Sequence, residues 1–232
     1  MNESRVKMAA SSGINGKKAV KGLYGVIDTT YLPLGAVEQA ARDIISGGAQ
    51  ILQLRAKGLA SGRMLIAARL LRAVTLESGV TFIVNDRVDV AMMSRADGVH
   101  LGQSDIPLEG ARALLGKDAI IGVSTHNLAE AAEAEKNGAD YISFGPIFPT
   151  KTKKDAHSPQ GLSALREMSR TSALPIVAIG GITAKNVGDV FSHGAASAAV
   201  ISEILTATDM KGKTAEIAAL IIKMYGKASA LP

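Results

Sequence analysis

Residues 119–144, AIIGVSTHNLAEAAEAEKNGADYISF, contain one complete unit of a pattern that recurs along the chain. The apolar run over 119–123 predicts a buried strand, and residues 127–137 predict a helix that ends at Asn137-Gly138. A second apolar run over 141–144 predicts the next strand. Strand, helix and strand in this order are the unit of a parallel sheet.

The same unit repeats on both sides of this stretch. Because the strands are apolar throughout rather than alternating, we expect helices to cover both faces of the sheet. Eight such units predict a single α/β domain, a closed (β/α)8 TIM barrel, with an open doubly wound sheet as the alternative. The predicted strands are 22–28, 51–55, 81–85, 98–101, 119–123, 141–144, 175–179 and 198–201. The predicted helices are 34–47, 60–77, 87–94, 107–115, 127–137, 161–170, 183–192 and 213–225.

Charge is concentrated at the amino terminus. The chain of 232 residues has a net charge of +5, and most of this lies within residues 1–21, which carry five basic residues against one acidic residue. We therefore predict a flexible polar leader over 1–21 and a catalytic barrel over 22–232. Aromatic residues make up 3% of the chain and there is no Trp, which argues against a nucleic-acid partner.

Other bulk features exclude several classes of protein. No apolar run reaches the roughly 20 residues of a membrane span, and residues 1–21 lack the apolar core of a signal peptide. We therefore expect a cytoplasmic protein without a membrane partner. Cys is absent, which excludes disulfides, thiolate metal sites and Cys nucleophiles. The sequence leaves a homo-oligomer open.

Cationic residues follow the second predicted strand. Alternation points Gln53 and Arg55 to one side of the sheet and the two neighbouring leucines to the other. Arg55 and Lys57 would suit a phosphate-rich ligand, Arg through its bidentate fork and Lys as a point charge. The alternative is a solvated rim in which Lys57 only aids solubility.

Carboxylates follow the third and fourth strands. Asn85-Asp86 and Asp105 come from neighbouring strand ends, where two carboxylates could share one Mg²⁺. The alternative is that Asp86 and Asp105 cap the helices that follow them.

Further polar segments follow the later strands. Gly145-Pro-Ile-Phe-Pro-Thr150-Lys-Thr152-Lys153 could hold an anion, and residues 146–157 could close over it. Gly180-Gly181 and Ile201-Ser202 follow the last two strands, where barrels often bind a phosphate, although Gly-Gly also occurs in tight turns. Ser124 either binds a ligand or takes part in helix capping. His126 is a candidate general base, and no His pair has zinc-ligand spacing.

Together these segments resemble the thiamine phosphate synthase family. The matching segments span about residues 22–205 and are Gln53-Leu-Arg55-Ala-Lys57, Asn85-Asp86, Gly98-Val-His-Leu-Gly-Gln103-Ser-Asp105, Gly122-Val-Ser124, Gly145 to Lys153, Ala178-Ile-Gly180-Gly181 and Val200-Ile-Ser202. The family often has an acidic residue where this chain has Ala56, but the flanking cations are present.

The resemblance implies a (β/α)8 fold, a Mg²⁺ cofactor and two small-molecule substrates. It implies a transferase that joins 4-amino-2-methyl-5-hydroxymethylpyrimidine diphosphate to 4-methyl-5-(2-hydroxyethyl)thiazole phosphate, giving thiamine phosphate and pyrophosphate. The implied residues are Asp86 and Asp105 for the metal; Arg55, Lys57, Asn85 and Lys153 for the pyrophosphate; Gln53 and Ser124 for the pyrimidine side; and Thr150, Thr152, Gly181, Ile201 and Ser202 for the thiazole phosphate. Arg55, Lys57, Ser124 and Lys153 are the expected catalytic residues.

Two other functions remain as alternatives. A thiazole tautomerase of the same superfamily would need a proton-transfer residue such as His126 but no diphosphate site. A non-catalytic barrel that only binds a phosphorylated metabolite would need no chemistry at all.

Overall fold

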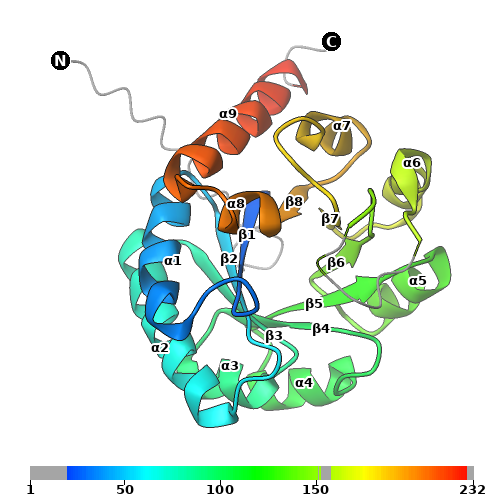
Figure 1. Ribbon diagram of the computed structural model, residues 1–232. Coiled ribbons are helices and arrows are strands. Elements are labelled where there is room, and N and C mark those ends of the chain that lie inside the picture. The colour runs from blue at the N-terminus through cyan, green and yellow to red at the C-terminus, as the bar shows by residue number, and fades with distance from the viewer. Residues whose placement is uncertain (1–19, 151, 153–157, 229–232) are drawn as a thin grey trace.

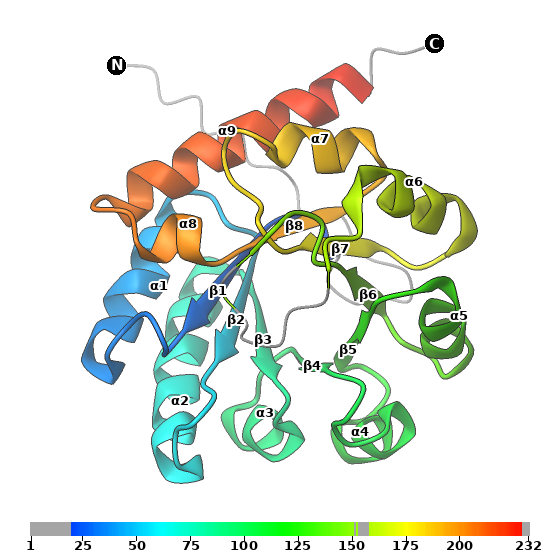
Figure 2. The same ribbon diagram turned by 45° about the vertical axis from the view of Figure 1, so that its right-hand side comes forward.

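Parallel strands close into a barrel in sequence order, and helices surround it (Figures 1 and 2). The computed structural model describes residues 20–150, 152 and 158–228. β8 pairs with β1, so the (β/α)8 barrel is confirmed and the open sheet is wrong. The strands are β1 (Gly22–Asp28), β2 (Ile51–Arg55), β3 (Thr81–Asn85), β4 (Gly98–Leu101), β5 (Ile120–Thr125), β6 (Tyr141–Phe144), β7 (Ile176–Ile179) and β8 (Ser197–Val200).

The helices follow the predicted order, with some differences at their ends. The helix predicted over 183–192 begins at Val187, because Thr183 and Asn186 form a turn in which the Thr183 backbone N–H donates to the Asn186 side chain at 2.8 Å. Helix α8 was not predicted, because four residues are too few to show a helical period. The elements are η2 (Leu34–Ala36), α1 (Val37–Ser46), α2 (Ser61–Ser78), α3 (Val88–Ser94), α4 (Leu108–Leu115), α5 (Leu128–Lys136), α6 (Gly161–Thr171), α7 (Val187–Ser192), α8 (Ser202–Leu205) and α9 (Met210–Ala228).

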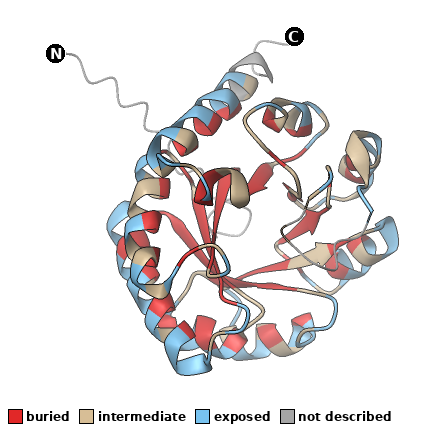
Figure 3. Ribbon diagram, viewed as in Figure 1, coloured by how far each residue is buried: buried red, intermediate tan, exposed pale blue. Residues whose placement is uncertain are grey.

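The apolar core has two layers, one inside the barrel and one between the strands and the helices. The strands are largely buried, whereas the helices carry many exposed residues (Figure 3). Leu52 and Leu54 belong to the outer layer, whereas Ile51 belongs to the inner one. Val20, which the sequence analysis placed in the leader, is buried in the inner layer, and residues 1–19 lie outside the described residues. Because inward and outward positions alternate, polar residues at the strand ends face the mouth of the barrel.

None of the helices in the described part of the chain is both long and apolar enough to cross a membrane.

Candidate active site

A cavity with charged side chains from the ends of β2 and β3 and from the loop after β4 lies at the carboxyl-terminal face of the barrel, and we call it the cationic cavity. It is lined by side chains from positions far apart in the sequence, which the barrel brings together. The residues predicted from sequence that line it are Gln53, Arg55, Lys57, Asn85, Asp86, Asp105 and Ser124.

A buried carboxylate holds Arg55 at the wall of this cavity. The register of β1 and β2 places Asp28 opposite Arg55, and an Arg55 guanidinium nitrogen donates to the Asp28 carboxylate. Asp28 has no exposed surface and also accepts from the Thr30 backbone N–H at 2.9 Å. Asp28 is not among the residues predicted from sequence, although an acidic residue that ends a fully buried strand could have indicated it.

Two acidic side chains face each other at the ends of β3 and β4. Burial and the nearby Asp105 carboxyl group raise the pKa of Asp86, while Lys57 lowers it. The Lys57 ammonium lies 3.6 Å from the Asp86 carboxylate. Asp105 accepts from the Gly102 backbone N–H at 2.7 Å, which fixes its orientation. The two like charges would be relieved by a cation between them.

The capping alternative for these carboxylates is wrong. Arg87 and Pro107 are the N-cap residues of α3 and α4, and neither helix has a side-chain cap. Asp86 has a φ of 64°, so its backbone is left-handed and its side chain turns toward the cavity instead. Two neighbouring carboxylates beside cationic side chains are a donor set that Mg²⁺ uses in proteins, so these residues fit that ion.

Hydroxyl and imidazole groups also lie among the apolar residues inside the barrel, below the cationic cavity. Tyr24, His100, Tyr141 and Ser143 line the cavity from inside the barrel, and the first three are joined by hydrogen bonds. None of these four residues is among the site residues predicted from sequence. The sequence could have indicated them, because a hydroxyl or imidazole group at an inward position of a buried strand needs a hydrogen-bond partner.

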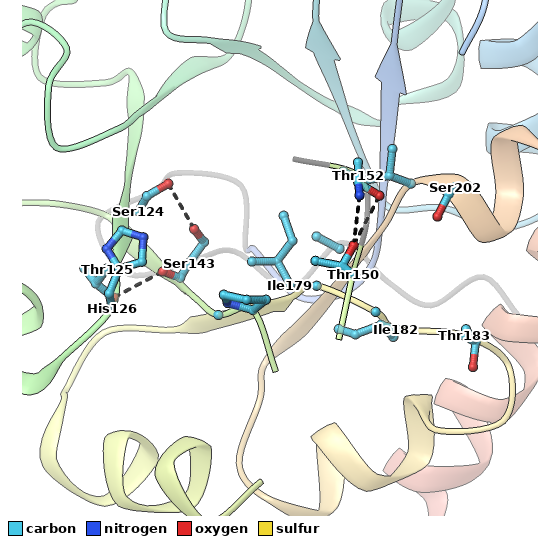
Figure 4. Close-up of a pocket in the computed structure, with 16 residues that line it drawn as sticks. Ser124, Thr125, His126, Ser143, Thr150, Thr152, Ile179, Ile182, Thr183 and Ser202 are labelled. Atoms are coloured by element: carbon cyan, nitrogen blue, oxygen red, sulfur yellow. Dashed lines mark hydrogen bonds between the residues drawn. The ribbon is translucent and has the colours of Figure 1, made fainter. Parts of the chain in front are cut away.

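A second cavity, which we call the hydroxyl cavity, lies at the ends of β5 to β8 (Figure 4). Thr150, Thr152, Gly181, Ile201 and Ser202, all predicted from sequence, line it. The Thr152 backbone N–H donates to the Thr150 hydroxyl at 3.3 Å.

Glycine is required at the end of β7 for two reasons. Gly180 and Gly181 have φ values of 96° and 65°. A Cβ at Gly181 would lie 2.6 Å from the Pro149 carbonyl oxygen, and one at Gly180 would lie 2.4 Å from Pro146. The loops after β6 and β7 can therefore approach each other only without these side chains, and both glycines line the hydroxyl cavity.

The two cavities share one wall. It consists of Ser124, Ser143, Ile179, Ala199 and Ile201, which line both of them. An anionic ligand in each cavity would therefore place its uncharged part near the same wall. Such a site is suited to joining two phosphorylated molecules.

Some of the remaining predictions from sequence are untested, and others differ from the structure. Lys153 and part of the proposed closing segment over 146–157 lie outside the described residues. Ser124 does not cap α5, because the Asn127 side chain accepts from the Glu130 backbone N–H. His126 lines the hydroxyl cavity, and its Nδ1 lies 2.9 Å from Glu130. Neither observation tests whether His126 acts as a general base, so that role stays a prediction. Among the described residues, no group of three or more His, Cys, Asp or Glu comes together as a metal site.

Known proteins resemble this chain over nearly its whole barrel. A family model described as thiamine monophosphate synthase matches residues 23–204. The thiamine-phosphate synthase of Shouchella clausii is 47% identical over 189 residues, covering 82% of this chain and 90% of that protein. The one of Methanocella arvoryzae is 48% identical over 183 residues, covering 79% of this chain and 86% of that protein.

A solved structure agrees with these relatives. Thiamine phosphate pyrophosphorylase from Pyrococcus furiosus superimposes with a TM-score of 0.81 at 38% identity, covering 88% of this chain and 96% of that one. With the family model and the two relatives, this shows that the chain belongs to the thiamine monophosphate synthase family.

Proposed function

We propose that this chain joins 4-amino-2-methyl-5-hydroxymethylpyrimidine diphosphate to 4-methyl-5-(2-hydroxyethyl)thiazole phosphate, forming thiamine phosphate and pyrophosphate. The observation that carries the proposal is the pair of cavities with one shared wall. The cationic cavity has the charges that a diphosphate needs, and the hydroxyl cavity has the hydroxyls and glycines that suit a monophosphate.

The pyrimidine diphosphate binds in the cationic cavity. Arg55, Lys57 and Asn85 contact its phosphates, and Lys153 is proposed to join them. Asp86 and Asp105 would hold Mg²⁺, which neutralises phosphate charge when it is bound. Asp28 holds the Arg55 guanidinium at the cavity wall through their buried ion pair.

The reaction breaks the bond between the pyrimidine CH₂ carbon and the diphosphate oxygen. The electron pair leaves with pyrophosphate, and Arg55 and Lys57 stabilise the charge that develops there. The electron-rich aminopyrimidine can carry the resulting cation. The thiazole nitrogen then donates its lone pair and forms the new carbon–nitrogen bond. No protein nucleophile is needed for these steps.

The thiazole phosphate binds in the hydroxyl cavity, with its phosphate near Gly181 and Ser202. Thr150 and Thr152 supply hydroxyl groups at the same cavity. The shared wall of Ser124 and Ile201 brings the thiazole ring next to the pyrimidine. Water would trap the pyrimidine cation, so the site must exclude it during the reaction, and residues 146–157 are proposed to cover it.

The direct test is pyrophosphate release on mixing both substrates with Mg²⁺. We expect one pyrophosphate per thiamine phosphate, and no release when Mg²⁺ is chelated. A thiazole tautomerase or a metabolite sensor would release none, and that result would refute the proposal.

A pair of arginine variants adds a matched control. Arg55→Gln should slow the release because it removes charge from the cationic cavity. Arg112→Gln should not, because Arg112 pairs with Asp140 at 2.7 Å and lines neither cavity.

A further inference from the structure

A continuous chain of hydrogen bonds crosses the barrel interior below the two cavities. The Gln53 side-chain amide nitrogen donates to the Tyr24 hydroxyl at 2.9 Å, and the Tyr24 and Tyr141 hydroxyls lie 3.0 Å apart. The Tyr141 hydroxyl lies 2.9 Å from His100 Nδ1, and His100 Nε2 lies 2.9 Å from the Ser124 hydroxyl. The chain thus joins a wall residue of the cationic cavity to the wall that both cavities share.

The fold holds the middle of this chain in place. Tyr24 and Tyr141 are 2% and 0% exposed, and burial raises the pKa of each phenol, so both keep their hydrogens. A Cβ at Gly122 would lie 2.0 Å from the Tyr141 ring, so glycine leaves the space that this ring occupies. The His100 ring stacks on Tyr141 with centroids 5.4 Å apart.

One direction gives every hydrogen of this series an acceptor within it, and it starts from the Gln53 amide nitrogen. The Gln53 nitrogen can only donate, so the Tyr24 oxygen accepts and the Tyr24 hydrogen points to Tyr141. The Tyr141 hydrogen then points to His100 Nδ1, which must accept it. In this arrangement the hydrogen of the His100 ring lies on Nε2.

This direction decides what Ser124 offers to a ligand. His100 Nε2 donates toward the Ser124 oxygen at 2.9 Å, and Ser143 is a second neighbour of the same nitrogen at 3.2 Å. The Ser143 hydroxyl also donates to the Ser124 oxygen, at 3.4 Å, so this oxygen accepts from both neighbours and its own hydrogen is left for the cavity. Ser124 lines both cavities, so this hydrogen is offered where the two substrates meet.

We infer that Tyr24, Tyr141 and His100 are positioning residues that hold Ser124 as a hydrogen-bond donor toward an acceptor atom of the pyrimidine substrate, such as a ring nitrogen. The inference rests on the proposed function for the identity of the substrate. This series of hydrogen bonds would then contribute to specificity. A ligand with a hydrogen-bond donor in place of the ring nitrogen would meet the Ser124 hydrogen and bind less well.

The first test measures the imidazole of His100 and needs no substrate. In protein labelled with ¹⁵N-histidine, we expect the His100 signals of the neutral tautomer with hydrogen on Nε2, and His100→Asn identifies those signals. Tyr141→Phe removes the donor to Nδ1, so a second tautomer should appear. A wild-type His100 with its hydrogen mainly on Nδ1 would overturn the inference.

The second test is a double-mutant cycle with Ser124. Tyr141→Phe and Tyr24→Phe should each lower the single-turnover rate of pyrophosphate formation by about 3- to 10-fold, the usual size for one hydrogen bond. In a Ser124→Ala background the same substitutions should change the rate by less than about twofold, because the group they position is gone. Equal effects in both backgrounds would refute a role through Ser124.

A control variant tests whether the loss of any buried hydroxyl slows the reaction, and a second tyrosine variant covers a failure to fold. Ser197→Ala also removes a buried hydroxyl, one that donates to the Gly22 carbonyl at 2.7 Å at the opposite end of the barrel, and it should leave the rate unchanged. If Tyr141→Phe fails to fold, Tyr24→Phe provides the same cycle. If the wild-type protein releases no pyrophosphate, the proposed function fails, and the tautomer measurement still decides whether the chain has the stated direction.

Discussion

Replacing Asp28 with Asn separates the charge of this buried carboxylate from its shape. The Arg55 side chain is 11% exposed and that of Asp28 is 0% exposed, and removing one partner of a buried ion pair costs about 3–5 kcal/mol. The Asn oxygen can still accept from the Thr30 backbone N–H, and Arg55 lines the cationic cavity. We therefore expect the free energy of unfolding to fall by an amount at the lower end of this range, about 3 kcal/mol. In a domain of this size, this corresponds to a fall in Tm of about 6–12 °C.

Activity should fall as well, because Arg55 loses the carboxylate that directs it at the diphosphate. A charge-assisted hydrogen bond is worth about 1.5–3 kcal/mol, so kcat/KM for the pyrimidine diphosphate should fall roughly 10- to 150-fold. The assay combines thermal unfolding followed by circular dichroism with initial rates of pyrophosphate release well below both values of Tm.

Asp140→Asn is the matched control. It also removes a carboxylate paired with an arginine, at 2.7 Å from Arg112, but away from both cavities. It should lower the Tm and leave kcat/KM unchanged. The reasoning would be refuted if Asp28→Asn kept full kcat/KM, or if it destabilised the protein no more than Asp140→Asn does.

Three further substitutions, and one control, address the metal site and the hydroxyl cavity. Because burial and Asp105 raise the pKa of Asp86, its charge is disfavoured in the folded state, so the free energy of unfolding of the metal-free protein should fall as pH rises above about 4. Asp86→Asn should remove this slope in urea unfolding and lose activity that extra Mg²⁺ only partly restores; unchanged turnover would refute the metal role. Gly181→Ala, with a φ of 65° and a Cβ 2.6 Å from a carbonyl oxygen, should cost about 1–3 kcal/mol and raise the KM for the thiazole phosphate. Gly138→Ala, with a φ of 84° in open space, should leave that KM unchanged, and a shared effect would contradict the assignment. Ser202→Ala should raise the same KM less than about tenfold, because backbone N–H groups remain; a complete loss of activity would show that this hydroxyl has a larger part.

Much of the arrangement could be predicted from the sequence because a barrel follows simple rules. Inward and outward positions alternate, so Gln53 and Arg55 were correctly placed on the cavity side and Leu52 and Leu54 on the helix side. The ends of parallel strands meet at one face, so residues far apart in sequence were expected together. Both rules depend only on strand order and alternation, which apolar runs reveal.

The remaining features depend on contacts between strands that no local pattern specifies. Asp28 matters because the register of β1 and β2 places it opposite Arg55. Tyr141 and His100 meet inside the barrel because Gly122 leaves room for the Tyr141 ring. Asp86 looked like a helix cap in the sequence, but its left-handed backbone at a φ of 64° directs it elsewhere.

A crystal structure with Mg²⁺, pyrophosphate and the thiazole phosphate tests the central claim most directly. We predict pyrophosphate within hydrogen-bond distance of Arg55 and Lys57, the metal at Asp86 and Asp105, and the thiazole phosphate beside Gly181 in the hydroxyl cavity. Pyrophosphate bound away from Arg55, or a metal that touches neither aspartate, would contradict the account.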